Sequence, residues 1–482
     1  MMEDKTMKKY FAIIAISLAT LTGCKNFLEE APLLSQSDVL TLSSFEGLDK
    51  VVAGAYAPLA SAGWYGSDWI LYNEMKTSNG KKHIGTSFDS GRLNDYYNIS
   101  YSSNETSAVY SGAYYVISAV NNVLAALPTV KADTLDKANI KAECLFLRAL
   151  SHFDAVLTYA QPYYQGAAGP GVPTVYKTDA SARPSRAKVS EVYDMVIADL
   201  TEAEKIISPD YVRAGVTDER AVATLPVIQA LLSRVYLYKG DWQNAADYAT
   251  KVIDCGKYKM WTPTDLAGAA CYLQDKGTGE VIFEVYAAVG NSYDPNGEHV
   301  GLFSMTTPAG YADAGCCQDI IDVFEDSDAR LGLFMVKDNC YFTKKYAGKG
   351  LRASDDPVNT IVIRLSEMYL NRAEAVINGA TGTDAAGKAY SATSDLATIA
   401  SNRGATAQPA TPSGVAMERR KELNWEAHLW FDLGRTGQAM TRVDVGADNI
   451  IKSLDPGDPR WAMPIPEHEI NANPNIEQNI GY

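Results

Sequence analysis

The sequence predicts a mostly α-helical protein, built from paired helices with long irregular insertions and a few short strands. Two observations predict this class. Several segments carry apolar residues at helical spacing, and long polar stretches rich in glycine and asparagine separate them. No low-complexity linker divides the chain, so we expect one compact body.

The expected helices are marked by apolar periodicity and by stop or start signals. They cover residues 113–127, 134–159, 190–207, 226–254, 361–378 and 415–433. Pro128 ends the first, and Ser190 is expected to cap the third. Residues 226–254 read as a hairpin that turns around Gly240. The run VIFEVYAAV from Val281 suggests a short strand, and the proline-containing segment 464–466 with the tail behind it is expected to be extended.

The amino terminus has the pattern of a secretory signal. Residues 7–24 read MKKYFAIIAISLATLTGC, and the apolar run is too short to stay in a bilayer as a spanning helix. The end of this stretch resembles a bacterial lipobox, in which Cys24 is acylated; an ordinary signal cleavage nearby is the alternative. We expect a signal peptide over residues 1–23, starting at Met7, and a single body over residues 24–482.

Within that body, the part up to about residue 111 is rich in loops, and residues from about 112 to 482 form the helical scaffold with its insertions. The net charge of −15 argues against nucleic acid and anionic lipid as partners. With five histidines and no cysteines at metal-ligand spacing, we expect no metal site and no cofactor, although structural calcium held by loop oxygens stays open. The pairing of the six cysteines after Cys24 also stays open.

Four separated motifs resemble the SusD/RagB family of surface glycan-binding lipoproteins. They are ECLFLRALSHFDAV at residues 143–156, IRLSEMYLNRAEA at 363–375, ERRKELNWEAHLWFDLGR at 418–435, and the carboxyl end from Arg460. Ala427, Leu429 and Gly434 depart from the family, which usually has glycine, arginine and arginine there. The resemblance covers nearly the whole body, from Cys24 to Tyr482.

The resemblance implies a tetratricopeptide-like scaffold with a ligand face built from loops. Tyr236, Gly240, Trp242 and Ala245 indeed fall on offsets that resemble a tetratricopeptide repeat, in which a small Ala245 lets two helices approach. The family resemblance further implies that the protein is a surface-exposed lipoprotein of the outer membrane and that it sits on a SusC-like TonB-dependent transporter.

The motif at 418–435 reads as structural from its residues alone. Glu418, Glu422 and Glu426 are like charges at i,i+4 spacing, which is tolerable only if neighbouring basic residues or other helices neutralise them. We therefore expect this segment to pack in the core with a charged rim.

The aromatic residues predict where a ligand binds. Tyrosine outnumbers phenylalanine 29 to 12, and a tyrosine ring offers an apolar face with a polar tip, as a sugar requires. Residues 61–111 and 281–346 are dense in aromatics and too long for structureless loops without a function. The candidate ligand residues are Trp64, Trp69, Tyr96, Tyr97, Tyr101, Asn104, Tyr293 and Tyr311, the last two forming an opposite wall. For each ring, packing onto the scaffold is the alternative.

These observations favour a non-catalytic protein that binds oligosaccharide and delivers it to a transporter. We find no Ser-His-Asp order, no phosphate loop and no metal cluster in the sequence. The alternatives are a peptide-binding member of the same family and, from a different class, a surface glycoside hydrolase, whose two carboxylates cannot be located from sequence.

Overall fold

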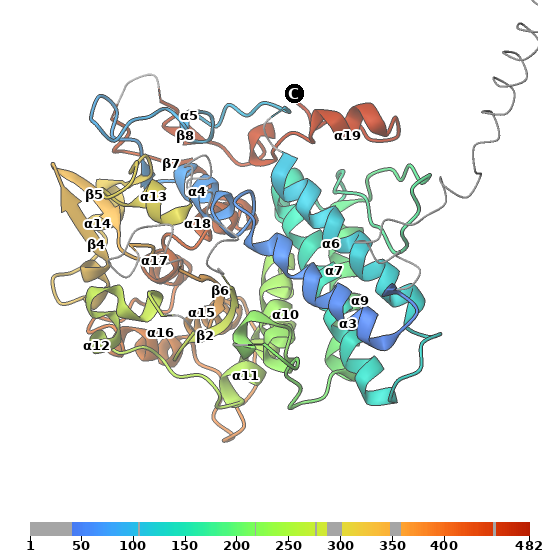
Figure 1. The fold of residues 1–482 in the computed structure, drawn as a ribbon. Coiled ribbons are helices and arrows are strands. Elements are labelled where there is room, and N and C mark those ends of the chain that lie inside the picture. Colours follow the sequence, from blue (N-terminus) through green and yellow to red (C-terminus); the bar gives the residue numbers. More distant parts are fainter. Residues whose placement is uncertain are drawn as a thin grey trace, which may run out of the picture.

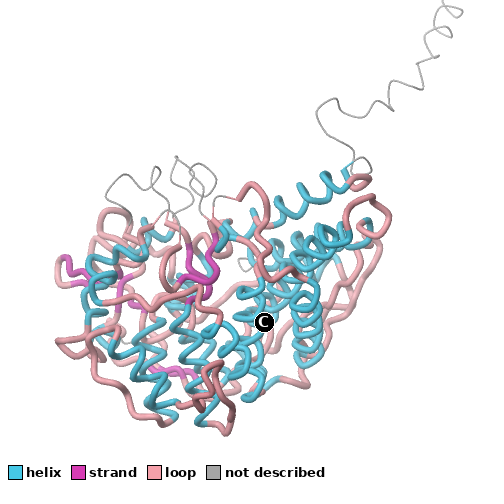
Figure 2. Tube along the Cα trace, turned by 90° about the horizontal axis from the view of Figure 1, so that it is seen from below, coloured by secondary structure: helices cyan, strands magenta, loops and turns pink. Residues whose placement is uncertain are grey.

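The computed structural model describes residues 41–104, 107–216, 218–274, 277–286, 301–347, 358–446 and 450–482. The expected signal peptide, Cys24 and Tyr293 lie outside these residues. The described chain is mostly helical, and the strands are few and short (Figures 1 and 2). None of its helices is long and apolar enough to cross a membrane.

The scaffold consists of helices that pack on their neighbours in sequence. They are α3 (Phe45–Ala55), α6 (Ser107–Ala126), α7 (Thr134–Tyr159), α9 (Val189–Ile206), α10 (Leu225–Lys239), α11 (Trp242–Asp254), α15 (Leu365–Ile377), α16 (Ala392–Ser401) and α17 (Pro412–Leu423). Helix α7 packs on α6 and α9, α10 packs on α9 and α11, and α15 packs on α11, α16 and α17. The predicted class, mostly α with paired helices, is confirmed.

The turn between α10 and α11 has the predicted form. Gly240 ends α10 in the left-handed region, with φ 79°, which glycine adopts without the steric cost that a side chain would add. Ala245 is fully buried where the two helices meet, and Trp242 is partly buried against the core. The two helices therefore close as a hairpin.

The cap of α9 differs from the prediction. Its N-cap is Lys188, not Ser190, and the Glu191 carboxylate accepts a hydrogen bond of 2.9 Å from the Lys188 backbone N–H. The helix therefore begins one residue earlier, because a glutamate in the first turn satisfies the free N–H.

Two predicted helices are interrupted. Residues 360–364 form strand β6 (Thr360–Arg364), and α15 begins only at Leu365. The segment 415–433 breaks after α17 and resumes as α18 (Leu429–Arg435), with Trp425 at φ 58° and Ala427 at φ 64° between them. The resemblance implies glycine at position 427, and the positive φ of Ala427 agrees with that expectation, because glycine adopts this conformation without steric cost.

The tail contains one helix that the sequence reading missed. Residues 464–466 are extended as predicted, but α19 (Glu467–Ala472) follows directly. Pro466 is its N-cap, outside the helix, so the prolines do not oppose it.

The strands join segments that are far apart in the sequence. β2 (Val281–Val285), the predicted strand, pairs antiparallel with β6. A second sheet has the order β1-β3-β5-β4, and a third pairs β7 with β8. Their bounds are β1 (Gly80–Lys81), β3 (Gly315–Cys316), β4 (Phe334–Lys337), β5 (Cys340–Thr343), β7 (Met440–Thr441) and β8 (Ser453–Leu454). The β1–β3 pair brings the two predicted insertions, 61–111 and 281–346, into contact.

The three glutamates of the 418–435 motif are buried, and they are neutralised mainly from other elements. Glu422 accepts hydrogen bonds from Arg330, Arg364 and Arg403. Glu418 accepts from Arg330, and Glu426 accepts from Arg364 and Lys345. The motif is therefore a core element, as predicted, but the expected charged rim is wrong: its glutamates are buried with their cationic partners.

Candidate functional site

Five of the predicted ligand residues belong to the core. Trp64, Trp69, Tyr96, Tyr97 and Tyr101 are each at most 8% exposed. The Trp64 indole N–H donates to the Asp154 carboxylate on α7 at 2.9 Å, and the Tyr97 hydroxyl donates to the Val445 carbonyl at 3.1 Å.

A ring buried in this way has no free face for a sugar. The structure therefore corrects the expectation that these five residues form an open platform. The rings pack in the core instead, and Trp64 and Tyr97 each add one polar contact that fixes their loop to another part of the chain.

The remaining two described candidates are exposed but lie apart. Tyr311 is 42% exposed and follows α13 (Leu302–Thr306). Asn104 is exposed. It lies close to the start of α19, where the Glu467 backbone N–H donates to the carbonyl of the neighbouring Ser103 at 3.1 Å. Figure 1 shows α13 and α19 on different sides of the molecule. The structure does not bring Asn104 to the wall that was predicted to face it.

The turn that carries Tyr311 is held by its own backbone. The Ala312 N–H bonds to the Ser304 carbonyl at 2.9 Å, and the Ala314 N–H bonds to the Met305 carbonyl at 2.8 Å. Ala312 takes φ 55°. Both bonds return to α13, so the backbone that follows Tyr311 is tied to this helix.

The first insertion reaches this turn through Ser90 and Arg92. The Ser90 backbone N–H donates to Asp313 Oδ1 at 2.9 Å, and its hydroxyl bonds to the other oxygen of that carboxylate. The Arg92 guanidinium carbon lies 3.9 Å from the centre of the Tyr311 ring. We call this place the Arg92–Tyr311 surface and define it by Lys82, Asp89, Ser90, Arg92, Tyr311 and Asp313.

The rim of the Arg92–Tyr311 surface is polar and ordered. Lys82 and Asp89 form an ion pair of 2.8 Å, and hydrogen bonding by Lys82 holds the pKa of the Asp89 carboxyl below its ordinary value. The two insertions touch here through Arg92 and Tyr311, and whether Tyr311 faces a ligand stays a prediction. Arg92 was not among the predicted ligand residues, because that prediction rested on aromatic and amide side chains. The presence of an arginine among the aromatic residues of the first insertion could have indicated it.

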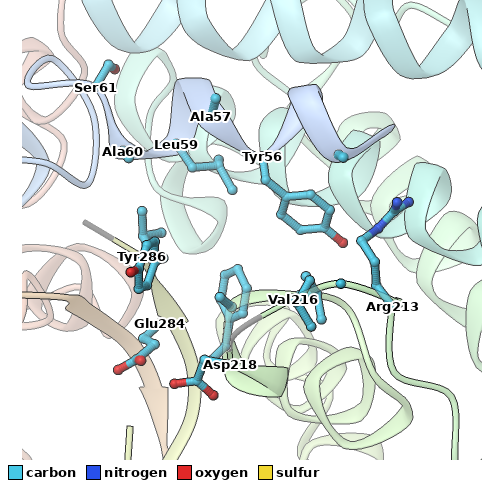
Figure 3. A pocket seen from close by; sticks show the side chains of 16 residues that line it. Tyr56, Ala57, Leu59, Ala60, Ser61, Arg213, Val216, Asp218, Glu284 and Tyr286 are labelled. Atoms are coloured by element: carbon cyan, nitrogen blue, oxygen red, sulfur yellow. The ribbon is translucent and has the colours of Figure 1, made fainter. Parts of the chain in front are cut away.

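A pocket of about 530 Å³ lies elsewhere, between β2 and the segment formed by α3 and η2 (Ala57–Ala60). Several of its polar groups already have partners: the Tyr56 hydroxyl donates to Glu143 at 2.7 Å, and the Gly277 N–H donates to both Asp218 and Glu284. Figure 3 shows the two carboxylates turned away from Tyr56.

The free lining of this pocket is therefore mostly apolar. A sugar needs hydrogen-bonding groups around its ring as well as an apolar face, and this pocket leaves few of them free. The Arg92–Tyr311 surface is therefore the better candidate for a ligand site.

Metal and thiol chemistry find no support in the described residues. In that part of the chain, no three histidine, cysteine or acidic side chains are grouped so that they could hold a metal ion. The cysteines at 144, 255, 271, 316, 317 and 340 are unpaired, and Cys144 is fully buried in the core.

The fold and this surface define a class of protein: an α-helical scaffold whose loop insertions build an exposed polar and aromatic face. Comparison with protein families gives the particular family. The family model described as "Starch-binding associating with outer membrane" matches residues 26–237, and the model of the SusD family matches residues 331–482. The chain belongs to the SusD/RagB family.

Relatives and solved structures agree with this assignment. The SusD-like protein P2 of Formosa agariphila is 28% identical over 52% of this chain, and the match spans about half, 46%, of that relative. A SusD superfamily protein from Bacteroides thetaiotaomicron is 26% identical, with a TM-score of 0.79 over 90% of this chain and 99% of the other.

The surface glycan-binding protein A of Bacteroides fluxus has the same fold, with a TM-score of 0.76 at 19% identity over 91% of this chain and 100% of the other. Glycan-binding proteins of the SusD family are non-catalytic, which agrees with the predicted binding role.

Proposed function

We propose that this protein is a non-catalytic outer-membrane surface lipoprotein that binds oligosaccharide or polysaccharide and delivers it to a TonB-dependent transporter. The observation that carries the proposal is the Arg92–Tyr311 surface, where an exposed aromatic ring and a guanidinium meet on a scaffold of the SusD/RagB family. Family members and structural neighbours described as starch-binding and glycan-binding support the ligand class.

The chemistry of this surface suits a sugar. A tyrosine ring presents an apolar face to C–H groups, while the guanidinium of Arg92 beside it donates hydrogen bonds to hydroxyls. Because the turn and the loop are tied together through Asp313, little ordering is required when a ligand binds, and this preorganisation favours affinity.

Incubation of the purified protein with a panel of polysaccharides tests the proposal. Retention of a glycan without new reducing ends is the expected result. Release of new reducing ends would identify a glycoside hydrolase, and retention of peptides alone would identify a peptide-binding member of the family.

We place the anchor of the protein at Cys24, acylated after removal of residues 1–23. Each buried CH₂ of an acyl chain contributes about 0.8 kcal/mol, so two or three chains hold a protein on a membrane durably. Mass spectrometry of the native protein should find acyl mass on Cys24. An unmodified amino terminus at another residue would contradict this placement.

The proposed partner is a SusC-like TonB-dependent barrel, with this protein as its lid. A protein anchored at one membrane face needs a separate pore to move its ligand inward. Pull-down from outer membranes solubilised in mild detergent should recover such a barrel, whereas recovery of the protein alone in every detergent would count against a stable complex.

A further inference from the structure

Arg92 differs from the arginines of the core in having no hydrogen-bond acceptor among the described residues. Its side chain is 41% exposed, and the nearest carboxylate oxygen, on Asp313, is 3.9 Å away. Arg148, Arg234 and Arg435, in contrast, each place two nitrogens on a carboxylate at 2.6–2.7 Å.

The acidic groups around Arg92 are already engaged. Asp313 is fully buried and accepts two hydrogen bonds from Ser90. Asp89 pairs with Lys82 at 2.8 Å, and Asp444 pairs with Lys81. Arg92 keeps only a long ion pair of 3.9 Å with the buried Asp313 carboxylate, so its positive charge is the least tightly paired at this surface.

The ring of Tyr311 prepares the guanidinium for an external acceptor. The guanidinium carbon of Arg92 lies over the ring, 3.9 Å from its centre, and the N–H groups lie in the guanidinium plane and have no acceptor among the described residues. Paired N–H groups in that plane match the two oxygens of a carboxylate or sulfate, and such charge-assisted bonds are roughly twice as strong as neutral ones.

We propose that the glycan bound at the Arg92–Tyr311 surface carries carboxylate or sulfate groups and that Arg92 selects them. This inference rests on the proposed glycan-binding function. The net charge of −15 opposes a polyanion at long range, but salt screens that repulsion beyond about 8 Å under physiological conditions. Recognition of the acidic sugar then depends on direct contact with Arg92.

The test compares polymers that differ only in charge. Polygalacturonate and its carboxyl-reduced form share one backbone, while alginate and chondroitin sulfate extend the acidic set and starch and laminarin the neutral set. The variants are Arg92→Gln, Arg92→Lys and, as a control, Arg183→Gln, whose exposed guanidinium bonds only to backbone carbonyls of its own loop.

The wild-type protein is expected to bind at least one acidic polymer tenfold or more tightly than the neutral ones. If that polymer is polygalacturonate, the protein should also prefer it to its carboxyl-reduced form by the same factor. Arg92→Gln should weaken acidic binding at least tenfold and change neutral binding less than threefold. Arg92→Lys should keep part of the preference, and Arg183→Gln all of it.

Binding of neutral glycans only, or acidic binding that Arg92→Gln leaves unchanged, would overturn the selectivity and leave the glycan-binding function standing. Failure of the wild-type protein to retain any glycan in either set would overturn both. Folding of each variant is checked by thermal melting, and the exposed position of Arg92 predicts no loss of stability.

Discussion

Replacing Glu422 by glutamine should destabilise the protein strongly, because this carboxylate sits among three buried arginines. Burial alone would raise its pKa, but Arg403, Arg364 and Arg330 hold the pKa of Glu422 well below its ordinary value. Its two oxygens accept from Arg403 at 2.6 Å and from Arg330 at 2.8 Å. Glutamine keeps the shape and removes the charge, which leaves buried cations only partly compensated.

Removing one partner of a buried ion pair typically costs about 3–5 kcal/mol. We expect a loss of that size in the free energy of unfolding of Glu422→Gln, measured by urea titration with circular dichroism at an unchanged m-value. The control is Glu46→Gln on α3, whose ion pair with Lys50 is exposed at the surface and should give no measurable shift. A loss below about 1 kcal/mol in Glu422→Gln would show that the neighbouring glutamates re-pair with the arginines and would refute the reasoning.

Three further predictions concern the fold. Gly240→Ala should cost about 1–2 kcal/mol because φ is 79° there, whereas Gly54→Ala, in α3 with open space around its Cβ, should gain about 0.5–1 kcal/mol; thermal melts of both compare them. Burial, with a smaller contribution from the hydrogen bond to Asp218, raises the pKa of Glu284 to about 8, so the folded state keeps a proton that the unfolded chain releases above about pH 4.5. The stability that this bound proton contributes is fully present below about pH 4.5 and falls as the pH rises toward 8, by up to about 1.4 kcal/mol per pH unit. Glu284→Gln should flatten this pH dependence in thermal melts across pH 4–9. Tyr97→Ala should lower stability by roughly 3–5 kcal/mol yet leave the glycan affinity of the folded protein unchanged; a large loss of affinity would return Tyr97 to the ligand face.

Helices were predictable where periodicity and boundary residues agreed. α7 occupies the expected residues 134–159, and Gly240 marks the predicted turn between α10 and α11 through a conformation that glycine itself favours. The break at Trp425 and Ala427 was not predictable, because neither residue type signals a positive φ. Strand β6 was mistaken for a helix start because a short apolar run has no period that separates the two.

The site was less predictable than the fold because exposure depends on tertiary contacts. Trp64 is buried in the core and donates a hydrogen bond to Asp154 on α7, while Tyr311 stays exposed on a turn. Both belong to aromatic-rich insertions, so composition alone could not distinguish them. The pairing of Arg92 with Tyr311 joins distant segments and becomes visible only when β1 and β3 pair.

The central claim is that the Arg92–Tyr311 surface binds glycan, and calorimetric titration of Tyr311→Ala with a polysaccharide retained by the wild-type protein tests it most directly. Loss of one stacking ring should weaken binding by about 1–3 kcal/mol, by analogy with base stacking, which is roughly tenfold to a hundredfold in affinity. Tyr115→Ala is the matched control, because Tyr115 is 65% exposed on α6 and should leave the affinity unchanged. Equal affinities for the wild type and a folded Tyr311→Ala protein would contradict the account.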